Sequence, residues 1–446
     1  MDSTINRDPR HDTPGSSNSV LSVTDIHAST VTIEKVLDHS ESGTGANQDI
    51  VYVRVSNVRD EQPSSPLQEI QLADSLTDPE SRHSTTFTHL VQSVMLPSRI
   101  MMSALRIPFK VALKGKRRPT WTTEMEMAVS AFRSACRNAP RDLNILRSWL
   151  DVDIFPSLML PSTVRMHETS LHAMKLEWIY PSSLQRNTGR HSSRHEIRDW
   201  SKEFPVVLYL HGGGFALCGN NTHRAMVAQF AAEGLILCAP NYRRPPDVSI
   251  IEAVDDCLAT YRYLVDVLGI APSRLSVMGD SAGGALTVLL LCRLRDMNQL
   301  RANEQSIPVP ACGVLLSPWV ELEDASIASE AEKGNIMPDH DFLPRDALMM
   351  ISRLVVGDLS PTDPRINPIS ARLDSLPKLL IHVGELELLF DQVTRFYEKI
   401  RDEGGQVKMK IWIDGVHVPH VFTSVCEEAR MAVYDAANFI TLNTTS

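Results

Sequence analysis

The feature that most constrains this chain is a glycine-flanked serine at residues 279–284, with the sequence GDSAGG. The apolar run before it, residues 275–278, is typical of a buried strand, and residues 285–291 have the composition of a helix. At a strand–turn–helix junction, glycines on both sides of a serine allow a sharp turn that lifts the hydroxyl clear of the sheet. The turn therefore predicts an α/β architecture with Ser281 as a nucleophile.

Short apolar runs alternate with helical stretches along the rest of the chain, at residues 206–210, 235–239, 312–316 and 379–383. Continuous apolar strands separated by helices indicate a mostly parallel sheet with helices on both faces. The net charge of −10 offers no positive field, so we expect no nucleic-acid partner.

Three consecutive glycines follow the first of these strands, in the sequence HGGGF at residues 211–215. Glycine leaves its backbone N–H unobstructed, and an oxyanion hole needs such donors preset where negative charge develops on an attacked carbonyl oxygen. The run therefore indicates an oxyanion hole upstream of the serine.

A serine hydrolase of this type also needs an acid and then a histidine, in that chain order. Glu385, Glu387 and Asp391 follow the strand predicted at residues 379–383, and His417 and His420 lie further on. The histidine would take the serine proton, and the carboxylate would orient its ring. The residues by themselves leave three acids and two histidines as candidates.

Five ordered motifs together resemble the hormone-sensitive-lipase-like (GDXG) branch of the α/β-hydrolases, over roughly residues 119–440. They are HGGGF, GDSAGG, Asn241-Tyr242-Arg243, Leu316-Ser317-Pro318-Trp319 and a GxxE/HxF ending. The chain is similar to steryl acetyl hydrolase-like esterases of that branch. The resemblance implies an α/β-hydrolase fold with a helical cap, formed by residues 86–150 and part of residues 327–356.

The resemblance also implies a role for individual residues. Ser281 would be the nucleophile and Glu387 the acid, and the oxyanion donors would be the N–H groups of Gly213, Gly214 and Ala282.

The base is harder to assign from spacing than the acid. Gly415 precedes His420 by five positions, whereas the family has three. His420-Val421-Phe422 keeps the HxF half of the motif, so His420 is favoured as the base, with His417 as the alternative.

These features predict a serine carboxylester hydrolase that cleaves a short acyl ester, such as an acetyl ester, of a hydrophobic alcohol or natural product. The chemistry needs no cofactor, and the histidines lack metal-ligand spacing. Two rivals are an acyltransferase that uses the same triad and a non-catalytic receptor for a hydrophobic ligand.

The composition divides the chain into three parts. Residues 1–85 are rich in Ser, Thr, Asp, Asn and Pro and are predicted to be a mostly disordered leader, in which residues 49–55 have the composition of a stray strand. Residues 86–118 form an amphipathic basic segment, either a cap helix or a helix that contacts a membrane surface as a peripheral partner. Residues 119–442 are the predicted hydrolase domain with its cap.

The expected compartment follows from the cysteines and the N-terminus. The seven cysteines form no CxxC pair, and the first residues lack the basic region and the following apolar region of a secretory signal. We therefore expect reduced thiols and an intracellular, cytoplasmic location, with association to the endoplasmic reticulum or a membrane surface as the alternative.

Overall fold

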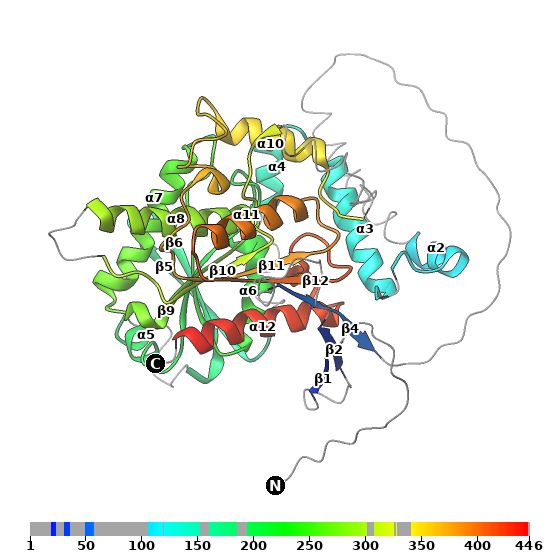
Figure 1. Cartoon of the computed structure of the whole chain (residues 1–446), viewed down its shortest axis with the longest axis horizontal. Helices are drawn as coiled ribbons and strands as arrows, with labels where there is room; N and C mark the ends of the chain where they lie inside the picture. The colour runs from blue at the N-terminus through cyan, green and yellow to red at the C-terminus, as the bar shows by residue number, and fades with distance from the viewer. Residues whose placement is uncertain are drawn as a thin grey trace, which may run out of the picture.

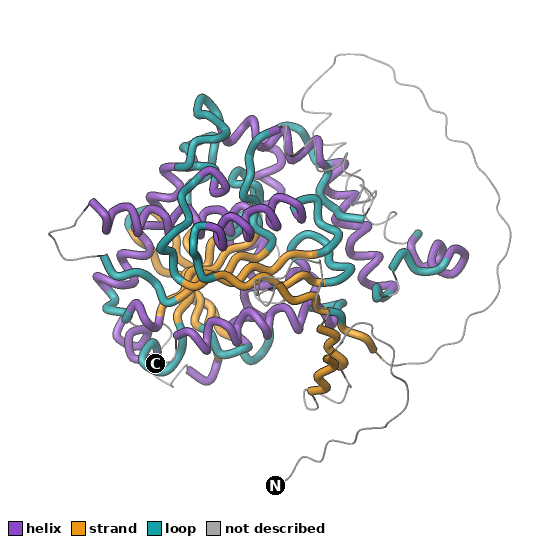
Figure 2. The backbone as a smooth tube through the Cα atoms, in the orientation of Figure 1, coloured by secondary structure: helices purple, strands orange, loops and turns teal. Residues whose placement is uncertain are grey.

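The computed structural model describes residues 19–23, 31–35, 50–57, 106–118, 120–151, 160–184, 194–300, 307–324, 327 and 340–444. Its centre is a nine-stranded sheet in the order β3-β12-β11-β10-β9-β7-β8-β6-β5 (Figures 1 and 2). The sheet strands are β3 (Ile50–Val53), β5 (Val164–Leu171), β6 (Met174–Pro181), β7 (Val206–Leu210), β8 (Ile236–Pro240), β9 (Leu275–Asp280), β10 (Cys312–Leu316), β11 (Lys378–Gly384) and β12 (Val407–Trp412).

The strand directions agree with the predicted α/β-hydrolase fold. β5 and β6 form an antiparallel hairpin, and β6 pairs antiparallel with β8. All other neighbours in this sheet run parallel. Every residue of β7, β8, β9 and β10 is buried, as expected for strands covered on both faces.

Helices cover both faces of the sheet. α7 (Ile250–Arg262), α8 (Ala282–Leu300) and α11 (Phe390–Asp402) pack in the larger core, and α6 (Asn220–Ala232) and α12 (Glu427–Thr444) pack in the core on the other face. The remaining helices are α2 (Ile107–Lys114), α3 (Thr123–Asn138), α4 (Leu143–Leu150), α5 (Arg194–Trp200) and α10 (Arg345–Val356), with short turns η1 (Ser182–Leu184), η2 (Tyr263–Val267), η3 (Pro272–Arg274), η4 (Pro368–Ser370) and η5 (Pro419–Phe422). No helix in the described ranges combines the length and apolar character needed to cross a membrane.

The sheet begins earlier in the chain than predicted. β3 pairs in parallel with β12, from Ile50 opposite Met409 to Val53 opposite Trp412. Val53 is buried against Trp412 and Ala432, so this apolar β-rich segment gains a core contact that its polar surroundings in the sequence did not reveal. The predicted boundary at residue 119 therefore leaves out one edge strand of the sheet.

Three further strands and the cap complete the described chain. β1 (Ser19–Val23), β2 (Val31–Lys35) and β4 (Val55–Asn57) form a small antiparallel sheet. Met125 and Val129 of α3, with Trp121 just before the helix, pack on the loops at the carboxyl end of the main sheet. The other parts of the predicted leader, residues 86–105 and residues 328–339 of the predicted cap lie outside the described residues.

Candidate active site

Ser281 occupies the sharp turn between β9 and α8. Its φ of 51° lies in the left-handed region, which is uncommon for a residue with a side chain. A Cβ on Gly279 would overlap the backbone of Gly283, and a Cβ on Gly283 would overlap the backbone oxygen of Leu210. The flanking glycines are therefore required by close packing, and the turn places Ser281 at the N-terminus of α8, where the helix dipole favours negative charge.

The glycine run after β7 forms the adjacent loop. Gly213 and Gly214 have φ values of 110° and 60°, and the N–H of Leu217 donates to the oxygen of Gly213 at 2.8 Å. The N–H of Gly212 donates to Asp280 Oδ1 at 3.0 Å, so the first glycine anchors the loop to the residue before the serine.

Asp280 joins these two turns and was not singled out from the sequence, although it lies inside the GDSAGG motif. Its buried carboxylate also accepts from the hydroxyl of Tyr209 and lies 3.2 Å from His223 Nε2. Burial by itself raises the pKa of Asp280, but the charge and hydrogen bond of His223 and the Tyr209 hydroxyl leave that pKa lowered. Asp280 is therefore an ionised anchor for the glycine loop that is predicted to form the oxyanion hole.

The acid and one histidine form a buried pair. Glu387, which follows β11, accepts a hydrogen bond from His417 Nδ1 with a separation of 3.0 Å to Oε2. A carboxylate only accepts, so Nδ1 carries the proton and Nε2 is left as the basic nitrogen of the neutral ring. The other carboxylate oxygen accepts from the hydroxyl of Ser317 at 2.5 Å and from the N–H of Gly384.

The surroundings of His417 favour its charged form. Burial lowers the pKa of His417, but the hydrogen bond and negative charge of Glu387, with further contributions from Asp341 and Asp280, outweigh burial and leave that pKa raised. A base whose cation is stabilised in this way suits proton transfer from a serine.

The structure reverses the preference for His420 over His417. His420 is fully buried, its Nε2 lies 3.0 Å from His382 Nδ1, and its Nδ1 finds no partner in the described part of the chain. Because His382 Nε2 bonds to the Asp435 carboxylate at 3.0 Å, its Nδ1 is the acceptor, and His420 is the donor. His420 therefore pairs with His382 and not with Glu387.

The alternative acids have different partners. Glu385 is exposed and accepts from the N–H of Asp414 at 3.0 Å, and Asp391 lies in the first turn of α11. Of the three candidate carboxylates, Glu387 alone bonds to a histidine within the described ranges.

The end of β10 connects the serine turn to this pair. The N–H of Ser281 donates to Leu316 O at 2.8 Å, and the next residue, Ser317, bonds to Glu387 and accepts from the N–H of Val418 at 3.0 Å. Ser317 was assigned no role from the sequence, in which it appeared only within the LSPW motif. Like the other site residues, however, Ser317 follows a strand end at this edge of the sheet. The structure thus brings Ser281, Glu387 and His417 to one edge of the sheet.

Two residues of the predicted cap, Ile351 of α10 and Arg147 of α4, approach the glycine loop after β7. A Cβ on Gly214 would lie 2.9 Å from Ile351 of α10 and 3.6 Å from Trp319, so both side chains line this position. Arg147 of α4 donates to the oxygen of Ala216 at 2.7 Å and holds the end of the loop.

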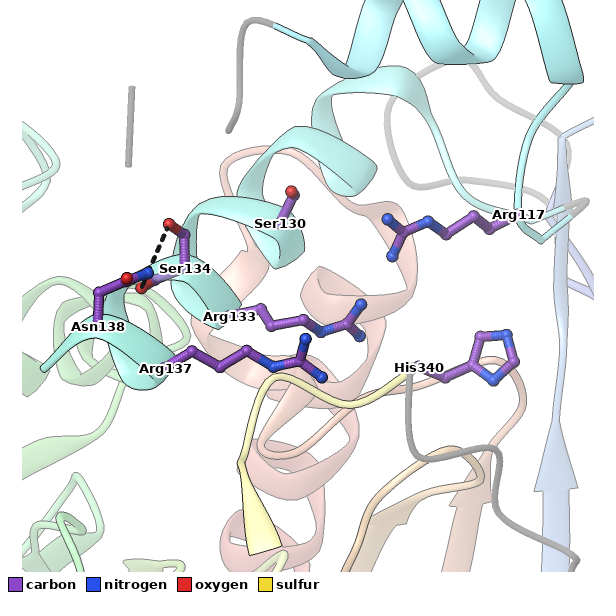
Figure 3. A pocket seen from close by; sticks show the side chains of 7 residues that line it. All are labelled: Arg117, Ser130, Arg133, Ser134, Arg137, Asn138 and His340. Atoms are coloured by element: carbon purple, nitrogen blue, oxygen red, sulfur yellow. Dashed lines mark hydrogen bonds between the residues drawn. The ribbon is translucent and has the colours of Figure 1, made fainter. Parts of the chain in front are cut away.

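A separate cavity of about 530 Å³ lies between α3, Arg117 and His340 (Figure 3). Its described lining residues are mainly basic and polar: Arg117, Ser130, Arg133, Ser134, Arg137, Asn138 and His340. Arg133 also donates through Nε and one Nη to the backbone oxygen of Asp341, at 3.0 and 2.8 Å. The cap helix is thereby linked to the loop that precedes α10.

Several proteins similar to this chain are named as esterases or acetyl-hydrolases. A family profile described as the α/β-hydrolase fold matches residues 207–421. An acetyl-hydrolase of Streptomyces hygroscopicus is 33% identical over 56% of this chain and 80% of its own length, and an esterase of Acinetobacter venetianus is 30% identical over 55% and 78%.

Solved structures agree with these relatives. An esterase of the bacterial hormone-sensitive lipase family superposes with a TM-score of 0.55 at 26% identity, covering 78% of this chain and 98% of that one. A hormone-sensitive lipase from a metagenome library gives a TM-score of 0.59 at 26% identity, over 72% and 98%. With this fold, these motifs and these relatives, the chain belongs to the hormone-sensitive-lipase-like family of α/β-hydrolases and is a carboxylic ester hydrolase.

Proposed function

We propose that the protein hydrolyses short-chain acyl esters, acetyl esters among them, of hydrophobic alcohols, with Ser281, His417 and Glu387 as the catalytic triad. The observation that carries this assignment is the 3.0 Å contact between His417 Nδ1 and Glu387 Oε2, next to the β10 end that binds Ser281. A triad is recognised by such geometry and by the role of each group.

In the first half of the reaction, Ser281 Oγ attacks the ester carbonyl carbon while His417 Nε2 takes the hydroxyl proton. The negative charge that develops on the carbonyl oxygen is stabilised by the N–H groups of Gly213, Gly214 and Ala282. The C–O bond to the alcohol then breaks, and His417 returns the proton to the leaving oxygen.

In the second half, water attacks the acyl-serine and gives its proton to His417. The second tetrahedral intermediate uses the same oxyanion donors, the carboxylic acid leaves, and the proton returns to Ser281. Glu387 holds Nδ1 protonated throughout, so Nε2 always faces the exchange.

The preference for a short acyl group rests on the groups beside the oxyanion loop. Trp319 and Ile351 approach Gly214 closely, and the ring of Phe215 lies 5.8 Å from that of Trp319. Bulky apolar side chains at this point restrict the volume available to an acyl chain. The name of the relative from Streptomyces, acetyl-hydrolase, supports the same proposal.

The test is covalent labelling of the full-length protein with a fluorophosphonate, followed by peptide mass spectrometry, in the wild type and in His417→Ala and His420→Ala. We expect an adduct on Ser281 in the wild type and in folded His420→Ala, with labelling lost in His417→Ala. Rates with 4-nitrophenyl acetate, butyrate and octanoate should then fall as the acyl chain lengthens. Absence of any adduct in the wild type would contradict the proposal and favour a ligand receptor.

Hydrolysis and acyl transfer are separated by product analysis. With a competing alcohol present, a hydrolase should still release mainly the free acid, because water resolves the acyl-serine. Predominant formation of the new ester would show that acyl transfer is the main reaction.

A further inference from the structure

The cap supplies a buried carboxylate that touches both loops of the proposed triad. Asp341, in the loop before α10, is 5% exposed. Its Oδ1 accepts from the N–H of His417 at 3.1 Å, and its Oδ2 accepts from the N–H of Leu388 at 2.9 Å. One side chain thus binds the backbone of the proposed base and the residue after the proposed acid.

Asp341 is itself held in place from two directions. Its Oδ1 accepts from the N–H of Phe342 at 2.8 Å, and its backbone oxygen accepts two bonds from Arg133 of α3 (Figure 3 shows Arg133 beside His340). The ring of Phe342 lies 6.0 Å from that of His417. The carboxylate is therefore rigid, and its position depends on the cap helix α3.

The charge of Asp341 also acts on the ring of His417, the residue whose backbone N–H it binds. The charged groups that face His417 come from three elements: Glu387 after β11, Asp280 at the end of β9, and Asp341 in the cap loop. In a buried site with a low dielectric, a nearby carboxylate such as that of Asp341 stabilises the imidazolium that forms when His417 takes the serine proton.

We propose that Asp341 is a positioning residue of the esterase, which fixes the Glu387 and His417 loops relative to each other and stabilises the His417 cation from the cap side. This inference deepens the proposed function and rests on it. In this proposal the cap helps to position the base, in addition to covering the substrate.

The test compares Asp341→Asn with the matched control Asp346→Asn, an exposed carboxylate five residues away in the first turn of α10. Asparagine keeps the size of the side chain, removes its charge and turns an NH₂ group toward at least one of the three backbone N–H donors that the carboxylate binds. We expect kcat to fall about tenfold with KM within about twofold, because the loss affects the transition state more than substrate binding. The control should keep the wild-type kinetics.

The pH profile provides a readout that a purely structural role would leave unchanged. Removing a negative charge near His417 lowers its pKa, so the neutral base persists to lower pH. The acid limb of kcat/KM should therefore move down by about 0.5 to 1 pH unit in Asp341→Asn. Asp341→Glu keeps the charge, and its acid limb should stay closer to that of the wild type.

Two results overturn the inference while the proposed function stands: wild-type kinetics in Asp341→Asn, or a loss of thermal stability with an unmoved pH profile. Fluorophosphonate labelling distinguishes failure of the Asp341 role from failure of the proposed triad. If Asp341→Asn gives either of these results while wild-type Ser281 is labelled and His417→Ala is not, only the role of Asp341 is rejected. If wild-type Ser281 is not labelled, the triad fails first.

Discussion

His417 and His420 lie three residues apart and end in opposite environments. His417 contacts a carboxylate and has a raised pKa, whereas burial and the neighbouring His382 hold the pKa of His420 well below its ordinary value. In a regular helix, residues three apart share a face. Here Val418, with a φ of 46°, lies between the two histidines and breaks that relation, so their rings face different partners.

The comparison separates two uses of a buried histidine. In the proposed mechanism His417 exchanges a proton through its basic Nε2. His420 instead belongs to a hydrogen-bonded network with His382, Asp435 and Lys410 that connects η5 to β11, β12 and α12. The pKa of Asp435 is about 2, because the bonds from His382 and Lys410 outweigh the effect of burial. This network of hydrogen bonds from His420 anchors η5, the turn that follows His417.

The largest effect should come from the first histidine. His417→Ala removes the proposed base, and kcat should fall by about 10³- to 10⁴-fold, as in other triads. Thermal unfolding, followed by circular dichroism, should show a folded protein. Equal loss of activity in folded His417→Ala and His420→Ala would remove the functional distinction between the two rings.

Glu387→Gln tests the partner that distinguishes His417. The amide replaces a charged acceptor, so the ring loses its fixed tautomer and its cation is less stable; kcat should fall by about 10²- to 10³-fold. Glu385→Gln is the matched control, since Glu385 is exposed and its side chain binds only the backbone N–H of Asp414 among the described hydrogen bonds. A larger loss in the control than in Glu387→Gln would transfer the role of the acid to Glu385.

His420→Ala should act mainly on stability. It removes a buried ring and leaves His382 Nδ1 without its donor, so the free energy of unfolding should drop by about 2 to 4 kcal/mol. Urea denaturation measures this change, and His420→Phe, which keeps the ring volume but not the donor, should lose less. Unchanged stability in His420→Ala would show that the histidine chain does not anchor the turn.

The smallest effect concerns pH. Because the base must be neutral and the pKa of His417 is raised above 6.5, the acid limb of kcat/KM should have its midpoint above 6.5 and activity should fall as pH drops through it. His420→Phe should leave this midpoint in place, within about 0.2 pH units, because His420 stays neutral over the same range. A shifted midpoint in that variant would mean that the two rings titrate together.

Much of the site was predictable because its chemistry is local. The turn around Ser281 needs glycines for close packing, the glycine run before Phe215 supplies backbone donors, and strand ends of a parallel sheet meet at one edge. Spacing after β11 was enough to favour Glu387. Asp341 and the His382 chain left no such signal, since each acts through contacts with residues far away in the sequence.

The sequence was sufficient to predict the fold class and to single out Ser281, Glu387 and the glycine loop as the proposed site, because each depends on short-range backbone geometry and on the alternation of strands and helices. Only the tertiary structure decided which histidine meets Glu387, because the left-handed Val418 and the contacts of Ser317 and Asp341 orient His417 toward the acid. It also decided that Ile50–Val53 belongs to the sheet, since the pairing with β12 joins segments more than 350 residues apart in the chain.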